Sequence, residues 1–200
     1  MIRISVSDVD QYRYYRASED MELDALLRRL RREEPPTPAM AMGTALHSIL
    51  EDAKDGDELS IVERDGFVFH FAFESTVELP PIRECKGEMH LTVDGIPVTL
   101  VGKVDCLDGQ RIWDHKLSST FDAEKYADSM QWRMYLMMFR AWRFTYNVFV
   151  HYEQPDGTIL VKDLHSFDFY RYPGMEDDIM RELREYVAFV REHLPEKVAA

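Results

Sequence analysis

The feature that most restricts the fold of this chain is a run of apolar segments joined by two Asp-Gly dipeptides. These dipeptides favour tight hairpin turns, because both residues tolerate the positive φ angles that such turns need. The dipeptides are Asp94-Gly95 and Asp108-Gly109, and the segments around them cover residues 84–93, 97–107 and 111–117. We therefore expect three consecutive antiparallel strands in the middle of the chain.

Segments on both sides of these strands show strand-like and helix-like patterns. Phenylalanine occupies every second position at Phe67, Phe69, Phe71 and Phe73, which is typical of a strand. The spacing of apolar residues indicates two further strands and four helices. The strands are expected at residues 145–152 and 158–169, and the helices at residues 22–32, 39–53, 123–143 and 175–193. This order predicts an α/β fold in which helices flank a central mixed β-sheet.

Length and composition indicate one globular domain. A chain of 200 residues with 46% hydrophobic residues can bury a sizeable core, so we expect a single domain over residues 1–200. No run of about 18 apolar residues is present, which argues against a membrane helix. The first residues lack the apolar core of a secretory signal, so we expect a cytoplasmic protein. Cys85 and Cys106 are too few for a disulfide framework and are expected to be buried thiols.

The charge of the chain limits how it can bind nucleic acid. It has 37 acidic residues against 24 basic ones, a formal net charge of −13. A protein that coats DNA is usually basic, because phosphate neutralisation supplies most non-specific affinity. An acidic protein can still act on DNA where positive charge is local and a metal ion adds to it. A candidate phosphate-binding patch, or else a solvated helix face, is formed by Arg28, Arg29, Arg31 and Arg32.

The hairpin around Asp108-Gly109 carries the residues that most suggest chemistry. Asp114 and Lys116 share one face of a strand, and the turn brings Asp105 to a comparable height on the neighbouring strand. Two such carboxylates suit Mg²⁺, which prefers oxygen ligands, and the backbone carbonyl of His115 offers a further oxygen. A lysine beside them can orient an attacking water or stabilise negative charge on a phosphate. The alternative is a hairpin with solvated charges.

Two helices place further polar residues at helical spacing. His47 and Glu51 are four residues apart on one helix, and Gly43 would let this helix approach the sheet closely. A histidine on such an apolar helix is either a structural residue or a ligand. Gln131 and Tyr135 are also four residues apart, on an apolar helix where polar side chains need hydrogen-bonding partners.

In chain order, these motifs resemble the RecB-like branch of the PD-(D/E)XK nuclease superfamily. The four motifs are Gly43-x-x-x-His47, Gly102-x-x-Asp105, Asp114-x-Lys116 and Gln131-x-x-x-Tyr135. Residues 4–12 are also similar to the N-terminal segment of that branch, so the resemblance spans about residues 4–140. It implies the restriction-endonuclease-like core of the superfamily, a mixed sheet flanked by helices.

The resemblance implies a catalytic role for most of these residues. His47, Asp105 and Asp114 would be metal ligands, and Lys116 would be the catalytic lysine. Mg²⁺ or Mn²⁺ is the expected cofactor, and an imidazole ligand favours Mn²⁺ because it is soft for Mg²⁺. The expected reaction is phosphodiester hydrolysis by water whose pKa the metal lowers.

The resemblance also assigns residues outside the hairpin. Gln131 and Tyr135 match a motif that lies near the active site and the DNA. Glu88 matches an acidic metal ligand upstream of the core strands, while Glu84 and Glu51 compete for that role.

The sequence departs from some members of this branch in two ways, and these differences indicate the type of nuclease. Relatives with an iron–sulphur cluster use an N-terminal cysteine and a C-terminal cysteine group, whereas here residues 12–16 hold no cysteine and none follows Cys106, so no cluster is expected. No phosphate-binding loop of a helicase motor is present either. The resemblance therefore implies a stand-alone phage-type exonuclease, in a bacterium or a phage-infected host.

DNA is the expected partner, and a recombination or single-strand-binding protein and a homo-oligomer are further candidates. Two alternatives remain open at this point. One is a catalytically silent scaffold that keeps the nuclease fold, and the other is a metal-dependent hydrolase of nucleotides or other phosphate esters.

Overall fold

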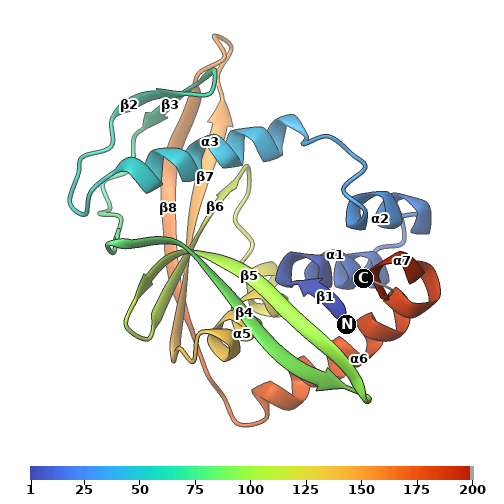
Figure 1. Ribbon diagram of the computed structural model, residues 1–200. Helices are drawn as coiled ribbons and strands as arrows, with labels where there is room; N and C mark the ends of the chain where they lie inside the picture. Colours follow the sequence, from blue (N-terminus) through green and yellow to red (C-terminus); the bar gives the residue numbers. More distant parts are fainter. Residues whose placement is uncertain (199–200) are drawn as a thin grey trace.

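The centre of the protein is an eight-stranded mixed β-sheet (Figure 1). The computed structural model describes residues 1–198. The strands are β1 (Ile2–Ser5), β2 (Ile61–Arg64), β3 (Phe67–Phe71), β4 (Ile82–Val93), β5 (Ile96–Asp108), β6 (Arg111–Ser118), β7 (Arg143–Glu153) and β8 (Ile159–Tyr170). Their order in the sheet is β1-β5-β6-β7-β8-β3-β2, and β4 pairs with β5 outside this path. The expected central mixed sheet is therefore confirmed.

The two Asp-Gly dipeptides form the expected hairpin turns. Asp94 and Gly95 both have positive φ angles, 48° and 79°, and they join β4 to β5 in an antiparallel pair. Gly109 has a φ of 58° at the turn from β5 to β6, which are also antiparallel. Strand β6 pairs in parallel with β7, as β1 does with β5 and β3 with β8, so the sheet combines parallel and antiparallel pairs. The short strands β1 and β2 lie at the two ends of the strand order and were not among the predicted elements.

Seven helices flank the sheet in the described part of the chain. They are α1 (Val6–Ala17), α2 (Leu23–Leu30), α3 (Pro38–Asp52), α4 (Ala123–Asp128), α5 (Met130–Met138), α6 (Met175–His193) and α7 (Pro195–Val198). Helix α3 begins where its sequence requires, because the Thr37 hydroxyl accepts a hydrogen bond from the N–H of Met40 and Pro38 follows at the first helical position. The helices expected at residues 22–32, 39–53 and 175–193 are confirmed within a few residues.

The single helix predicted over residues 123–143 is wrong, because the chain breaks at Ser129. Ser129 has φ −55° and ψ 139°, and its hydroxyl accepts a hydrogen bond from the N–H of Gln131, which caps a new helix, α5. Helix α5 ends at Met138, and Arg140 has a positive φ of 52° before β7 begins. Serine competes with the backbone for hydrogen bonds, which favours a helix start over a helix interior.

Two apolar clusters pack the helices against the sheet. Helix α3 packs Ala45 and Leu46 into a cluster with Phe69 and Phe149 of the sheet. Helices α1, α5 and α6 contribute to a second, larger cluster that includes residues of β1, β5, β6 and β7. Within residues 1–198, none of these helices has the length and apolar character needed to cross a membrane.

Candidate metal centre

The candidate site lies where one side of strand β5 lacks a partner strand, a stretch that we call the gap. Strand β5 pairs with β4 along nearly its whole length, but on its other side it pairs with β1 only up to Val101 and with β6 only from Cys106. Residues 102–105 have no strand partner on that side. Side chains bond there instead: the Tyr135 hydroxyl donates to the Lys103 carbonyl at 2.8 Å, and the His115 N–H donates to Asp105 Oδ2 at 2.6 Å.

Gly102 makes room for the side chain that fills this gap. A Cβ at this position would lie 2.3 Å from Cε1 of Tyr135, far inside van der Waals contact. Tyr135 thus lies against β5 and bonds its backbone, so the Gly102 and Tyr135 motifs contact each other directly. The expectation for Gly43 is wrong, because a Cβ there would meet no atom within 4 Å.

His47 and Asp105 meet at this gap. His47 Nδ1 of α3 lies 3.2 Å from Asp105 Oδ1, and the other carboxylate oxygen is held by the backbone of His115. Burial opposes charge on both groups, but their mutual contact outweighs it. The pKa of His47 is therefore raised and the pKa of Asp105 is lowered, which favours a charged pair.

Asp114 and Lys116 lie across the gap from His47, on β6. Lys116 Nζ is 2.6 Å from Asp114 Oδ2, while Gln131 Nε2 of α5 donates to Asp114 Oδ1 at 3.0 Å. The contact with Lys116 is an ion pair without hydrogen-bond geometry, so Oδ2 is a buried oxygen that lacks a hydrogen bond. A buried carboxylate oxygen needs a partner, and here the neighbouring cation is the ammonium of Lys116.

The two aspartates differ in their tendency to ionise. Burial raises the pKa of Asp114, against the attraction of Lys116, and the charge of Asp105 raises it further. Asp114 in turn raises the pKa of Lys116, although burial opposes that change. The lysine is thus held protonated, and Asp114 is the carboxyl that would gain most from a neighbouring divalent cation.

Only the backbone of His115 belongs to the site. Its imidazole is 2% exposed and lies between Cys106 and Asn147, with Nε2 3.4 Å from the Cys106 sulphur and Nδ1 3.4 Å from the Asn147 amide nitrogen. Burial lowers the pKa of this imidazole to about 4. His115 therefore keeps a neutral ring in the core while its backbone N–H orients Asp105.

Glu84 of β4 is the acidic residue that joins His47 and Asp105. One donor atom from each of the three residues lies within 4.8 Å of the other two, and a cavity of about 10 Å³ lies among them. A cavity of that size holds about one water-sized particle. Glu84 has a positive φ of 50°, and its carboxylate forms an ion pair with Lys103. Such backbone conformations are uncommon for glutamate and gather at functional sites.

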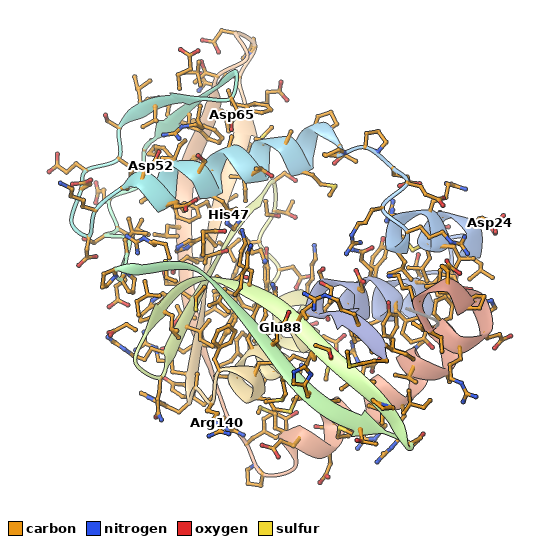
Figure 2. All side chains as sticks on the ribbon, in the orientation of Figure 1. Asp24, His47, Asp52, Asp65, Glu88 and Arg140 are labelled. Atoms are coloured by element: carbon orange, nitrogen blue, oxygen red, sulfur yellow. The ribbon has the colours of Figure 1, made fainter. Side chains whose placement is uncertain are left out.

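The structure does not bring Glu88 to this group. Its carboxylate pairs with Arg3 at 2.8 Å, and Figure 2 shows it well apart from His47. Strand register explains the difference. Counting outward from the Asp94-Gly95 turn in equal steps places Glu84 opposite Asp105, and Glu88 opposite Val101. Because the turn was visible in the sequence, this count was the signal that could have selected Glu84. Glu51 lines the same cavity as Glu84 but is exposed.

Two residues that the motifs did not single out hold Gln131 in place. Tyr146 of β7 donates its hydroxyl hydrogen to Gln131 Oε1 at 3.2 Å, which leaves the amide nitrogen facing Asp114. Asp10 of α1 accepts hydrogen bonds from the N–H groups of Met130 and Gln131, at 2.7 and 3.2 Å. Only the position of Asp10 inside the similar N-terminal segment marked it in the sequence.

The arginine cluster at the C-terminal end of α2 forms ion pairs on the surface of the protein. All four side chains are in ion pairs, which ties α2 to α1, to α7 and to the loop that follows it. The pairs are Arg28 and Arg29 with Glu34, Arg31 with Glu196, and Arg32 with Asp8. This pairing favours a solvated helix face over a phosphate-binding patch.

Comparisons with known proteins show similarity in fold. No family model matches the chain, and no curated protein matches it. Among solved structures, the protein SSO0001 superposes with a TM-score of 0.58 at 15% identity, covering 94% of this chain and 77% of that one. The alkaline exonuclease LHK-Exo from Laribacter hongkongensis gives a TM-score of 0.48 at 14% identity over 98% of this chain and 93% of its own. At these identities the likeness to SSO0001 concerns the fold alone.

Proposed function

We propose that this protein is a divalent-metal-dependent nuclease of the RecB-like branch of the PD-(D/E)XK superfamily that acts on DNA. The observation that carries the proposal is the meeting of Asp105, Asp114 and Lys116 at the gap in β5, with His47 beside them. Two carboxylates and a protonated lysine on adjacent strands are a combination that suits phosphodiester hydrolysis.

The residues of the centre fit a divalent cation. Asp114 Oδ2 is a buried oxygen without a hydrogen bond, and His47, Glu84 and Asp105 offer three donor atoms around a cavity of ionic size. Oxygen ligands suit Mg²⁺ and the imidazole favours Mn²⁺. The proposed ligands are His47, Glu84, Asp105, Asp114 and the backbone carbonyl of His115.

Side chains around the proposed metal ligands position the groups that would react. Lys116, kept protonated by Asp114, is placed to orient the attacking water and to stabilise negative charge on the phosphate. Gln131 donates a hydrogen bond to Asp114 Oδ1, and Asp114 Oδ2 lies beside the ammonium of Lys116. His47 and the N–H of His115 fix the two oxygens of Asp105. Bound Mg²⁺ or Mn²⁺ would supply the acidity of the attacking water and neutralise charge on the phosphate.

Within this class we propose an exonuclease of DNA repair, recombination or phage DNA processing, on the resemblance of its motifs to stand-alone phage-type enzymes. The acidic chain is compatible with this function if the metal ion and a few local cations hold the phosphates. Lys116 and Lys125 line a cavity of about 420 Å³ beside the centre. Sites of this size can enclose small ligands.

The test is degradation of end-labelled linear DNA and of closed circular DNA with Mn²⁺ or Mg²⁺. Lys116→Met removes the charge at similar side-chain length, and Lys162→Met is the matched control, because Lys162 is a half-exposed lysine of β8. We expect loss of linear DNA only, retained in Lys162→Met and reduced at least about a hundredfold in Lys116→Met.

Other outcomes would change the proposal in defined ways. Cutting of circular DNA would keep the site and replace exonuclease by endonuclease action. Hydrolysis of nucleotides without hydrolysis of DNA would assign the site to another phosphate ester. An absence of all hydrolysis with either metal, in protein that is folded by circular dichroism, would refute the catalytic proposal.

A further inference from the structure

Helix α1 contributes one carboxylate to the N-terminal end of α5. Asp10 Oδ1 accepts a hydrogen bond from the N–H of Met130 at 2.7 Å. Its Oδ2 accepts from the Ser129 hydroxyl at 2.6 Å and from the N–H of Gln131 at 3.2 Å. The first N–H groups of a helix have no partner inside the helix, and a negative charge there is favourable. Asp10 thus fixes the point at which α5 begins.

Gln131, which Asp10 holds at this helix start, orients the proposed metal ligand Asp114. Gln131 is the second residue of α5, and its side-chain amide donates to Asp114 Oδ1 at 3.0 Å. Tyr146 bonds the other end of the same amide and thereby fixes which way it points. A shift of the α5 N-terminus would move the Gln131 amide, and Asp114 would lose the hydrogen bond that fixes its Oδ1 while Oδ2 contacts Lys116.

Both oxygens of Asp10 are needed for this arrangement. An asparagine has only one acceptor oxygen, so Asp10→Asn can keep either the bond to Met130 or the bonds to Ser129 and Gln131, and its NH₂ group would face an N–H donor. Asp10 itself bonds none of the proposed metal ligands in the described structure. Its effect on the centre therefore passes through the backbone and side chain of Gln131.

We propose that Asp10 is a positioning residue, which sets Asp114 for metal binding through the N-terminus of α5 and Gln131. This inference rests on the proposed function in that it concerns the same metal centre. Partners of metal ligands commonly contribute about 10–100-fold to metal affinity or activity when they are removed. We expect Asp10→Asn to lower Mn²⁺ affinity by a factor in that range.

Asp8 provides a matched control within the same helix. It is 3% exposed and pairs with Arg32 and Lys197 instead of α5. Replacing either aspartate by asparagine removes one carboxylate charge from α1. We expect Asp8→Asn to lower stability towards urea but to leave Mn²⁺ affinity and the rate of DNA hydrolysis unchanged, whereas Asp10→Asn lowers both.

The decisive experiment is a double-mutant cycle of Asp10→Asn with Gln131→Ala in the full chain. Mn²⁺ affinity is measured by calorimetry, and kcat and KM are measured on linear DNA. If Asp10 acts through Gln131, Asp10→Asn weakens Mn²⁺ binding about tenfold or more in the wild-type background and has no further effect in Gln131→Ala. The loss in hydrolysis is expected in kcat rather than in KM.

Two results would overturn the inference. Equal effects of Asp8→Asn and Asp10→Asn on Mn²⁺ affinity would mean that both act only through global stability. Additive effects of Asp10→Asn and Gln131→Ala would mean that Asp10 does not act through Gln131. The calorimetric arm does not depend on DNA hydrolysis, so a protein that binds Mn²⁺ but cleaves no DNA would refute the proposed function and still test this inference.

Discussion

The buried imidazole of His115 makes the stability of the protein depend on pH in a way that the structure specifies. The Asn147 amide oxygen accepts a hydrogen bond from Ser166, so its NH₂ group faces His115 Nδ1. Nδ1 is then an acceptor, and the ring proton sits on Nε2, towards the Cys106 sulphur. A second ring proton, on Nδ1, would face the NH₂ group of Asn147, and both residues are only 2% exposed. His115 is therefore neutral in the folded protein.

The magnitude follows from the pKa. Burial lowers the pKa of His115 from an ordinary 6.5 to about 4. Between these values the unfolded chain binds the proton and the folded protein does not, so falling pH favours unfolding. The contribution of His115 is complete above pH 6.5 and is lost as the pH falls towards 4. At about 1.4 kcal/mol per pKa unit, the loss amounts to roughly 3 kcal/mol.

The assay is urea unfolding of metal-free protein at several pH values from 7.5 down to 4, with His115→Gln compared with wild type. The comparison is needed because the raised pKa of Asp114 acts in the opposite direction, since protonation of that carboxyl favours the folded state. We expect wild type to lose about 3 kcal/mol more than His115→Gln over this range. Parallel curves for wild type and His115→Gln would refute the reasoning.

The remaining predictions concern the gap, the ligand set and the competition between protons and metal ions. Gly102→Ala should lower the free energy of unfolding by roughly 1–3 kcal/mol in urea titrations, because its Cβ would overlap Tyr135, whereas Gly43→Ala should raise it by up to about 1 kcal/mol. Glu84→Gln should weaken Mn²⁺ binding in calorimetry and Glu88→Gln should not; the reverse order would contradict the proposed ligand set. Because the pKa of Asp114 is raised and Mn²⁺ requires the ionised carboxylate, Mn²⁺ affinity should increase as the pH rises from 5 to 7, and a flat profile would contradict this.

The parts of the fold that follow from local signals could be predicted from the sequence. The Asp94-Gly95 and Asp108-Gly109 turns determine both hairpins, because the positive φ angles are a property of those residues themselves. The α/β class could be predicted from the order of the strand-like and helix-like segments. The residues at the gap were named correctly as neighbours for a similar reason, since the second turn alone sets Asp105 beside Asp114.

What could not be predicted depends on contacts between distant segments. The apolar pattern of residues 123–143 is continuous, and the break at Ser129 involves the carboxylate of Asp10, more than a hundred residues earlier in the chain. The choice between Glu84 and Glu88 is a different case, because it was missed although the sequence held the signal. Strand alternation does not separate the two residues, since they are an even number apart. The choice required the register of the hairpin, carried from the turn to the gap.

The gap itself explains why these side chains gather at one place. Strands β1 and β6 pair with different parts of β5, and the backbone between those parts must find other partners because buried polar groups left unpaired are costly. Tyr135 bonds the β5 backbone at Lys103, and the Asp105 carboxylate bonds the β6 backbone at His115. Gln131 and His47 then contact neighbouring carboxylate oxygens. One oxygen remains without a hydrogen bond, Oδ2 of Asp114, beside the ammonium of Lys116. Because the arginines at the end of α2 are already paired with carboxylates of the protein, the carboxylate of Asp114 and the ammonium of Lys116 are where a cation and a phosphate would find complementary charge.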